Sequence, residues 1–407
     1  MPVSFTEEAQ HGRESGMALL IVIFIVTLLT AMIVSFADTT QKHLKVTVNY
    51  KNRLQAYWTA QSGMQMAAQL LTLSAQQGGG HHGLDNACWH SESPCYQELV
   101  LPRLLVPLPG SNSFMEPALS ATTATTGQIE ASTISRCPIV DENRKLSLYD
   151  LFTTQKTDAD TFHRLVYLLE YLLTEEDLLP PEERTQSAES VVQTSSPQRI
   201  SLDEAERLAG YLVDWVDTEV NSSADLNTDA AEEACPADGK PYLAKNGLLD
   251  SVEEIAQVCG FRQMAKNTIQ KLTQHLTVYP VETNINTATL PVLHAFCALA
   301  DENAQEAVSE QLYNSLHSAT TDTVPPAFES KQSIADDPSG LIANGEVAKE
   351  LKDHLEVKSD CFRVALYGLV RDPETGLEEA RARVEMVLNV QAQNPSGGLG
   401  LLYYRED

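Results

Sequence analysis

The feature that most constrains this chain is an uninterrupted apolar stretch near its N-terminus. Residues 17–37 read MALLIVIFIVTLLTAMIVSFA and contain no charged side chain. About 20 such residues are enough to cross the hydrocarbon core of a bilayer as an α-helix. The stretch is also longer than the apolar region of about 7–15 residues that is usual for a removable signal peptide. The sequence therefore predicts a membrane anchor.

The helical pattern does not stop where the apolar stretch ends. From Leu44 to Leu71, apolar and aromatic side chains recur at mostly helical spacing, and no Pro or Gly interrupts the pattern before Gly63. We therefore expect one helix over residues 17–71, roughly 80 Å long at about 1.5 Å per residue.

The flanking charges do not settle the orientation of this anchor. Arg13 precedes the stretch, and the basic residues that follow it closely are Lys42, Lys45, Lys51 and Arg53. The positive-inside rule alone would place the C-terminal bulk in the cytoplasm, but large domains can be translocated regardless of flanking charge. A generic signal anchor, or a signal peptide cut after Ala37, is an alternative interpretation.

The charge balance narrows the classes of partner. The chain has 407 residues, with 56 acidic and 28 basic side chains and a formal net charge of −28. A surface of that sign repels phosphate backbones, so nucleic acid is not expected as a partner, whereas divalent cations and basic protein surfaces suit it. Plain solubility is the simplest reason for such a charge. At about 100–200 residues per domain, the length predicts two or three domains.

Residue patterning divides the rest of the chain into sheet, helical and sheet parts. Within residues 77–140, residues 128–135 alternate as in a strand. Residues 361–370 and 380–391 alternate again and predict a β-hairpin, followed by a final strand at 400–406. Helical spacing in between predicts helices at residues 158–173, 202–216, 250–258, 263–276, 290–299 and 302–316. The residues expected to cap helix N-termini are Ser201, Ser251 and Thr289.

The N-terminal arrangement resembles that of type IV pilin and pseudopilin precursors. A short polar leader ends in Gly16, and the apolar stretch and the long helix follow it. The resemblance implies that a prepilin peptidase cuts after Gly16 and methylates Met17 as the mature first residue. Most family members carry Glu at the fifth mature position, where this chain has Ile21. Lack of that Glu is characteristic of one member of the family, the minor pseudopilin K of type II secretion systems.

Five further motifs resemble those of pseudopilin K and follow the order in which that family has them. They are Val140–Ser147 (VDENRKLS), Leu212–Asp217 (LVDWVD), Lys245–Glu254 (KNGLLDSVEE), Asn284–Ala288 (NINTA) and Lys358–Arg363 (KSDCFR). With the N-terminus, they span nearly the whole chain. The resemblance implies an α+β fold, in which a pilin-like long N-terminal helix packs on an antiparallel sheet and a large all-helical (SAM-like) insert interrupts the sheet.

The expected domain organisation combines the patterning with this resemblance. The domains are a leader peptide at 1–16, the transmembrane and amphipathic helix at 17–76, the first part of the pilin-like domain at 77–140, a first helical insert domain at 141–280, a second one at 281–345, and the closing strands at 346–407.

The resemblance implies a mechanical role. The chain would be a minor pseudopilin that caps or initiates the periplasmic pseudopilus and forms a tip complex with minor pseudopilins I and J and other pseudopilins. It would cross the bacterial inner membrane once, with its C-terminal bulk in the periplasm. A minor pilin of a type IV pilus and a signal-anchored periplasmic binding protein are the alternatives. The sequence contains no GxSxG, HExxH or Walker loop, so we do not expect an enzyme.

One segment of the helical part, DWVDTEVNSSADLNTDAAEEACPADG, concentrates carboxylates. Asp225, Asn227 and Asp229 place oxygen ligands at alternate positions, as in the first half of an EF-hand loop, but Ala230 and Pro236 break the rest of that pattern. The resemblance to pseudopilin K, which binds calcium in this region, supports a looser calcium site; a solvated acidic loop is the alternative. The predicted ligands are Asp217, Asp225, Asn227, Asp229 and Glu232.

The cysteines leave their pairing open. Cys88 and Cys95 enclose a short loop, and a disulfide between them is expected if this part lies in an oxidising compartment. Either disulfide bonds or buried free thiols are compatible with the sequence at the dispersed cysteines, which are Cys137, Cys235, Cys259, Cys297 and Cys361. No CxxC pair occurs, which excludes the spacing of a zinc ribbon.

Overall fold

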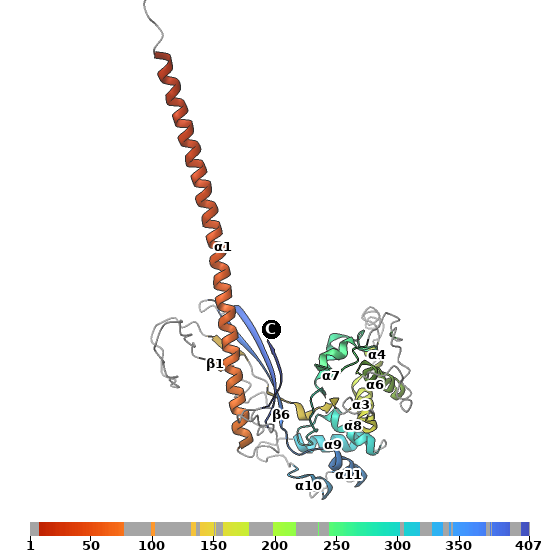
Figure 1. The fold of residues 1–407 in the computed structure, drawn as a ribbon. Coiled ribbons are helices and arrows are strands. Elements are labelled where there is room, and N and C mark those ends of the chain that lie inside the picture. Colours follow the sequence, from red (N-terminus) through yellow and green to blue (C-terminus); the bar gives the residue numbers. More distant parts are fainter. Residues whose placement is uncertain are drawn as a thin grey trace, which may run out of the picture. The chain divides into compact units, whose positions relative to one another are not determined.

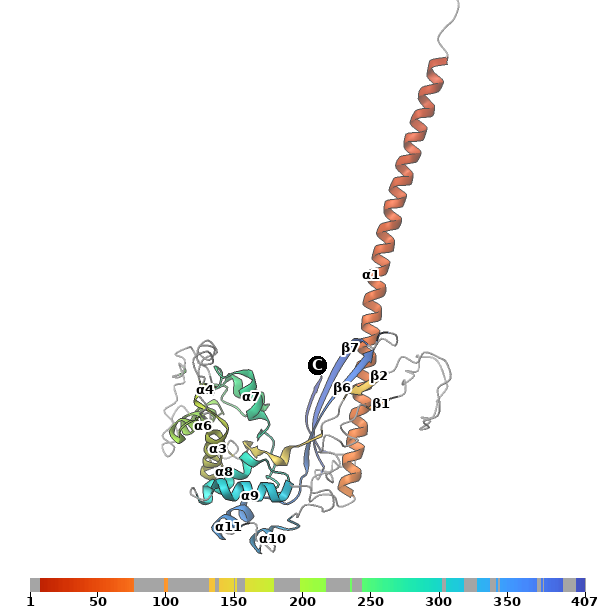
Figure 2. The same cartoon turned by 180° about the vertical axis from the view of Figure 1, so that it is seen from behind.

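A computed structural model gives the fold of the chain, and Figures 1 and 2 show it from opposite sides. The structure describes residues 8–76, 99–101, 132–135, 139–149, 151, 158–178, 198–216, 235, 244–301, 305–317, 328–336, 342, 345–371, 375, 377–390 and 400–406. The chain divides into two compact units. Unit 1 comprises residues 1–62, 99–135 and 367–383, and unit 2 comprises residues 63–98, 136–366 and 384–407.

The N-terminal helix α1 runs from Glu8 to Gln76 (Figure 1). Its course through residues 17–71 confirms the predicted long helix. Residues 8–16 of the predicted leader are also helical, because EAQHGRESG contains good helix formers and no Pro. The glycines within the helix do not break it, since a glycine in a helix interior costs only about 0.5–1 kcal/mol relative to alanine.

Unit 1 contains two short strands besides the ends of two longer ones. β1 (Leu99–Leu101) pairs antiparallel with β2 (Ser132–Ser135). β2 in turn pairs antiparallel with the last residues of β6 (Cys361–Arg371). β2 lies inside the predicted strand at 128–135, whose first residues are outside the described part of the chain.

Small residues let α1 approach a strand closely in unit 1. Ala56 of α1 is fully buried and packs with Val370 and Ala382. Gly368 faces α1 from β6: a Cβ at this position would collide with the backbone carbonyl of Ala56 and lie 2.7 Å from the backbone nitrogen of Ala60. The contact between helix and strand therefore depends on the absence of a side chain at position 368.

The remaining strands belong mostly to unit 2. β3 (Ile139–Asp141) pairs antiparallel with the start of β6. β7 (Glu378–Asn389) pairs antiparallel with β8 (Gly400–Glu406), with a bulge between Val387 and Leu388. The sheet has the order β1-β2-β6-β7-β8, and β3 also lies on β6. The predicted hairpin and final strand are confirmed, with end shifts of the ordinary size.

The helical part is an insertion into this sheet. β3 and β6 are hydrogen-bonded neighbours, yet every helix after α1 that the structure describes lies between them in the chain. These helices are α3 (Ala159–Leu172), α4 (Glu175–Leu178), α6 (Leu202–Val216), α7 (Lys266–Thr273), α8 (Leu290–Ala300), α9 (Gln305–His317), α10 (Lys331–Asp336) and α11 (Gly345–His354). Their apolar faces share one core, to which α3 contributes the fully buried Phe162, Leu165 and Leu169. The predicted α+β arrangement with a helical insert is therefore observed.

Two predicted helices differ from the structure. The helix expected at 250–258 is a 3₁₀-helix, η3 (Val252–Gln257), and it is followed by Gly260 in the left-handed region with a φ of 82°. The helix expected at 263–276 is reduced to α7, because residues 276–277 instead form β5, which pairs in parallel with β4 (Leu146–Ser147). The sequence pattern gave no signal for a strand pair this short, since helical periodicity extends across it.

The predicted N-caps have different outcomes. Ser201 Oγ accepts a hydrogen bond of 3.3 Å from the backbone nitrogen of Glu204, as a capping residue does. Ser251 and Thr289 occupy N-cap positions, but their side chains make no capping hydrogen bond. The Thr289 hydroxyl is instead 2.8 Å from Nδ1 of His275.

Substituting Gly368 tests the close approach in unit 1. We expect Gly368→Ala to destabilise the contact between α1 and β6 by about 1–3 kcal/mol, because the added methyl group meets backbone atoms that cannot rotate away. Urea unfolding of the purified chain measures the change. Gly345→Ala is the matched control, since a Cβ there has no neighbour within 4 Å. Equal stability of both variants would contradict the packing argument.

Candidate functional site

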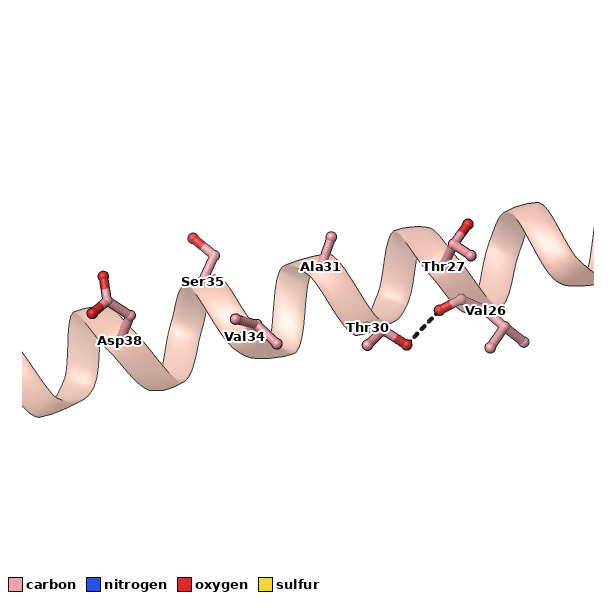
Figure 3. Close-up of a pocket in the computed structure, with 7 residues that line it drawn as sticks. All are labelled: Val26, Thr27, Thr30, Ala31, Val34, Ser35 and Asp38. Carbon is pink, nitrogen blue, oxygen red and sulfur yellow. Dashed lines mark hydrogen bonds between the residues drawn. The ribbon is translucent and has the colours of Figure 1, made fainter.

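The apolar stretch of α1 is exposed along its length. Among the described residues, α1 is the one helix that is long and apolar enough to cross a membrane. Figure 3 shows part of this surface, where Thr27, Thr30 and Ser35 lie among Val and Ala side chains and Asp38 follows. The hydroxyl of Thr30 donates to the carbonyl of Val26 at 2.7 Å, and that of Thr27 donates to Phe24 at 2.8 Å. These hydroxyls are therefore satisfied within the helix, as an apolar medium requires.

The residues of the predicted processing site lie on α1. Gly16 is inside the helix, and the next side chain, Met17, is 67% exposed. Ile21 is 57% exposed and offers only an aliphatic surface. Cleavage after Gly16 and methylation of Met17 stay predictions. The predicted calcium ligands, Asp217, Asp225, Asn227, Asp229 and Glu232, and the predicted disulfide partners, Cys88 and Cys95, lie outside the described residues.

The described residues on both sides of the acidic segment are held in place. α6 ends at Val216, which is buried, and the carbonyl of Trp215 accepts a hydrogen bond of 3.0 Å from Asn246. At the other end of the segment, Cys235 is buried and forms a disulfide with Cys259, with 5.4 Å between the Cα atoms. Residues 217–234 of the acidic segment thus lie between two fixed points of unit 2.

Of the cysteines left open by the sequence, Cys137 lies outside the described residues, and the four described ones divide into two kinds. Cys235 and Cys259 form a disulfide bond, and Cys235 lies near the C-terminal end of the acidic segment. Cys297 and Cys361 are free and buried, and burial raises the pKa of the Cys297 thiol to about 12. A thiol of that kind is neutral at physiological pH, so neither free cysteine has the character of a nucleophile.

Unit 2 contains a buried polar network, which we call the polar junction. It joins three segments, residues 139–147, 282–289 and 356–363. Asp141 Oδ2 accepts hydrogen bonds from the hydroxyls of Ser359 at 2.5 Å and Thr287 at 2.7 Å. These contacts tie the end of β3 to two segments that lie far along the chain.

Asn143 makes the central backbone contacts of the polar junction. Its Oδ1 accepts from the backbone nitrogens of Asp360 at 3.1 Å and Cys361 at 2.8 Å. Its Nδ2 donates to the carbonyl of Glu282 at 2.9 Å. The backbone nitrogen of Asn284 donates to the carbonyl of Asn143 at 2.7 Å. One buried asparagine thereby satisfies backbone groups from both other segments.

A cluster of charged side chains lies beside these hydrogen bonds. Glu142 is fully buried, and its Oε1 lies 2.8 Å from Nζ of Lys145 and 2.7 Å from Nε of Arg363. Arg363 also binds Glu385 of β7 at 2.9 Å and lies over the ring of Tyr279. Burial alone would raise the pKa of Glu142, but the charges of Lys145 and Arg363 hold it below its ordinary value. Both carboxylates are therefore paired through one guanidinium group.

The polar junction explains three of the sequence motifs. VDENRKLS supplies Asp141, Asn143 and Lys145, and NINTA supplies the two asparagines that the junction buries. Asn284 Nδ2 donates to Ser359 at 2.8 Å, and Asn286 Nδ2 donates to the carbonyl of Val357 at 3.0 Å. KSDCFR supplies Ser359 and Arg363. These motifs hold the helical insert to the sheet, and within the described residues no group of His, Cys, Asp and Glu is arranged to bind a metal ion.

Sequence reasoning missed the roles of Arg363 and Glu385. Alternation gave no signal, because Arg363 and Glu385 occupy the positions that alternate with the apolar residues of their strands, where solvent exposure is expected. The structure instead pairs these opposite charges across neighbouring strands and buries Glu385.

Comparisons with known proteins agree with this architecture. Residues 173–281 match the family described as Type II secretion system (T2SS), protein K. No curated protein matches the chain. A solved structure that resembles it is a chain of "The Crystal Structure of the GspK-GspI-GspJ complex from enterotoxigenic Escherichia coli Type 2 Secretion System". The likeness covers 90% of this chain and 99% of that chain, with 17% identity and a TM-score of 0.52, so it concerns the fold.

Removing the shared guanidinium tests the charged cluster. We expect Arg363→Met to lower the free energy of unfolding by about 3–5 kcal/mol, because it leaves Glu385 without this partner and Glu142 with Lys145 alone in a buried place. Denaturant titration of the purified chain measures the loss. Arg207→Met is the control, since Arg207 pairs with Glu204 while 65% exposed, and a surface pair contributes about 0–1 kcal/mol. A loss no larger than that of the control would show that the cluster does not hold the junction.

Proposed function

Because residues 173–281 match the family of type II secretion system protein K and the chain has the fold of a chain in a GspK-GspI-GspJ complex, we propose that it is a minor pseudopilin at the tip of a periplasmic pseudopilus. The match of residues 173–281 to that family carries the proposal. The pilin-like arrangement of α1 and the sheet supports it. The proposed role is structural: the chain assembles with other subunits and does not act as an enzyme.

We propose that α1 anchors the chain in the bacterial inner membrane, with the C-terminal bulk in the periplasm. The charge-free, exposed surface from Met17 to Ala37 supports the anchor. The prepilin peptidase would cut after Gly16 and methylate the new N-terminus at Met17. The helix would then leave the bilayer by packing against the corresponding helices of other pseudopilins.

The side chain at position 21 supports a place at the end of the filament. Ile21 cannot offer a carboxylate to the N-terminal amine of a neighbouring subunit. A buried amine without a partner is costly, by about 3–5 kcal/mol when one member of a buried ion pair is missing. That cost does not arise where no further subunit follows. The large helical insert would also crowd an internal position.

We propose minor pseudopilins I and J as the direct partners. The similar solved complex contains proteins named GspK, GspI and GspJ. The chain has the fold of a chain in that complex over 90% of its length, which supports a corresponding assembly.

We also propose that the acidic segment binds calcium. Carboxylate and amide oxygens are the ligands that Ca²⁺ prefers, and Asp217, Asp225, Asn227, Asp229 and Glu232 supply them within a short stretch of chain. The fixed ends of the segment, at Val216 and the Cys235–Cys259 disulfide, support the site because they limit the loop-closure entropy lost on binding.

The mass of the mature N-terminus tests the pseudopilin proposal. In cells that contain the prepilin peptidase, we expect a chain that begins at methylated Met17, and in cells without the peptidase we expect the intact leader. Mass spectrometry of the purified chain measures both. A start at Asp38, or an intact N-terminus in both strains, would identify an ordinary signal peptide or anchor and overturn the proposal.

Co-isolation separates a secretion tip from a type IV pilus. Affinity isolation of the processed chain from membranes is expected to recover pseudopilins I and J in equal amounts with it. Recovery of type IV pilins instead would support the alternative function as a minor pilin.

Calcium binding is tested by thermal unfolding with and without added CaCl₂ after chelation. Calcium at about 100 times the dissociation constant should stabilise the chain by about 2.7 kcal/mol. The double variant Asp225→Asn, Asp229→Asn should lose this stabilisation. Asp203→Asn, which changes an exposed acid of α6, is the matched control. An equal calcium response in the double variant would place the ion elsewhere.

A further inference from the structure

The polar junction contains two adjacent carboxylates with opposite surroundings. Glu142 pairs with Lys145 and Arg363 at 2.8 and 2.7 Å. Asp141, its neighbour, is equally buried, but no ion pair joins it to any cation of the described residues. Its contacts are two hydroxyl groups and a backbone nitrogen, that of Asn143 at 2.9 Å. A buried carboxyl group that has no cation beside it favours its neutral, protonated form over its ionised form.

We propose that Asp141 is a proton-binding site that sets the strength of the polar junction, so that the junction is tighter in mildly acidic medium than at neutral pH. The inference rests on the geometry of unit 2 and does not depend on the proposed function.

Both protonation states of Asp141 fit the contacts. The ionised carboxylate accepts hydrogen bonds from Ser359, Thr287 and the backbone of Asn143. A hydroxyl group is an acceptor as well as a donor, so the hydroxyl of Ser359 or Thr287 can accept a hydrogen bond from the protonated carboxyl group. Asp141 can therefore gain or lose its proton while the three segments stay in contact. Only the strength of the hydrogen bonds between them changes.

The surrounding charges come from the same three segments. The titratable and charged groups on these segments are Glu142, Arg144, Lys145, Glu282, Glu356, Lys358, Asp360, Cys361 and Arg363. Arg144 favours the ionised form of Asp141, whereas burial opposes it more strongly and raises the pKa of Asp141 to about 6. The Cys361 thiol is kept neutral by burial and by nearby carboxylates, including Asp141, so it adds no charge.

The direction of the pH dependence follows from the raised pKa. The folded state holds the proton of Asp141 more tightly than the unfolded state, whose carboxyl has the ordinary pKa of 3.8. The stabilisation is complete below the ordinary pKa and is lost as the pH rises through about 6. Between about pH 5 and about pH 7.5, the equilibrium constant for opening the junction should rise about tenfold.

Hydrogen exchange of the full chain in detergent micelles tests the inference. After correction for the intrinsic exchange rate, peptides covering residues 139–147 and 356–363 should show about tenfold faster opening at about pH 7.5 than at about pH 5. Asp141→Asn should abolish this difference. Asp353→Asn, an exposed aspartate of α11, is the matched control and should retain it. Retention of the full difference in Asp141→Asn would overturn the proposal.

A second variant keeps the test decisive if Asp141→Asn fails to fold. Ser359→Ala removes one hydroxyl that favours the ionised carboxylate, so the pH at which opening accelerates should move upward. Infrared difference spectra of the wild-type chain give an independent reading, because a protonated buried carboxyl has its own carbonyl band. That band should disappear between about pH 5 and about pH 7.5. Its absence at the lower pH, or an unchanged midpoint in Ser359→Ala, would contradict the assignment.

Discussion

The pairing of Glu142 with Arg363 is the interaction on which the architecture of unit 2 depends. A carboxylate and a guanidinium group are both removed from water there, and each is tolerable only because the other is present. Arg363 belongs to β6 and Glu142 follows β3, so the pair is placed where the helical insert leaves the sheet and where it returns. Glu385 extends the pair to β7. The cost of leaving any one of these charges alone fixes the register of three strands relative to the insert.

The hydrogen bonds beside this pair explain why an insertion of such length is compatible with an ordered sheet. An insert between adjacent strands separates their pairing residues by most of the chain, and closing that loop carries an entropic cost that grows slowly with length. Asn143 and Asp141 offset this cost with buried hydrogen bonds to both other segments of the polar junction, 282–289 and 356–363. The helical part then needs only its own apolar core, which it has. Assembly at a filament tip would use the insert as a bulky, internally stable body carried by a pilin-like sheet.

An element could be predicted from the sequence when the interactions that form it join residues that are close together in the chain. The long helix was predictable because its cause is local: residues 17–37 have no charge, and the periodicity continues to Leu71. The longer strands were predictable for the same reason, since alternation is visible within each one. Short elements such as β4 and β5 were not, because their pairing joins Leu146 to Leu276 and neither segment alone has a strand pattern. The motifs that carried the family resemblance could be recognised in the sequence. That three of them meet in the polar junction could not be predicted from it.

The sequence by itself determined the anchor helix, the α+β class, the helical insert and the excess of acidic charge, because each of these depends on composition or on periodicity over neighbouring residues. Only the tertiary structure decided that Asp141, Asn143, Asn284, Ser359 and Arg363 meet in one buried junction, and that Cys235 pairs with Cys259. It also decided that two neighbouring acids, Asp141 and Glu142, differ in their proton affinity. The physical reason is that burial and partner choice depend on residues that are distant in the sequence, 24 positions apart for the disulfide and 218 for the contact of Asp141 with Ser359, and no local pattern records them.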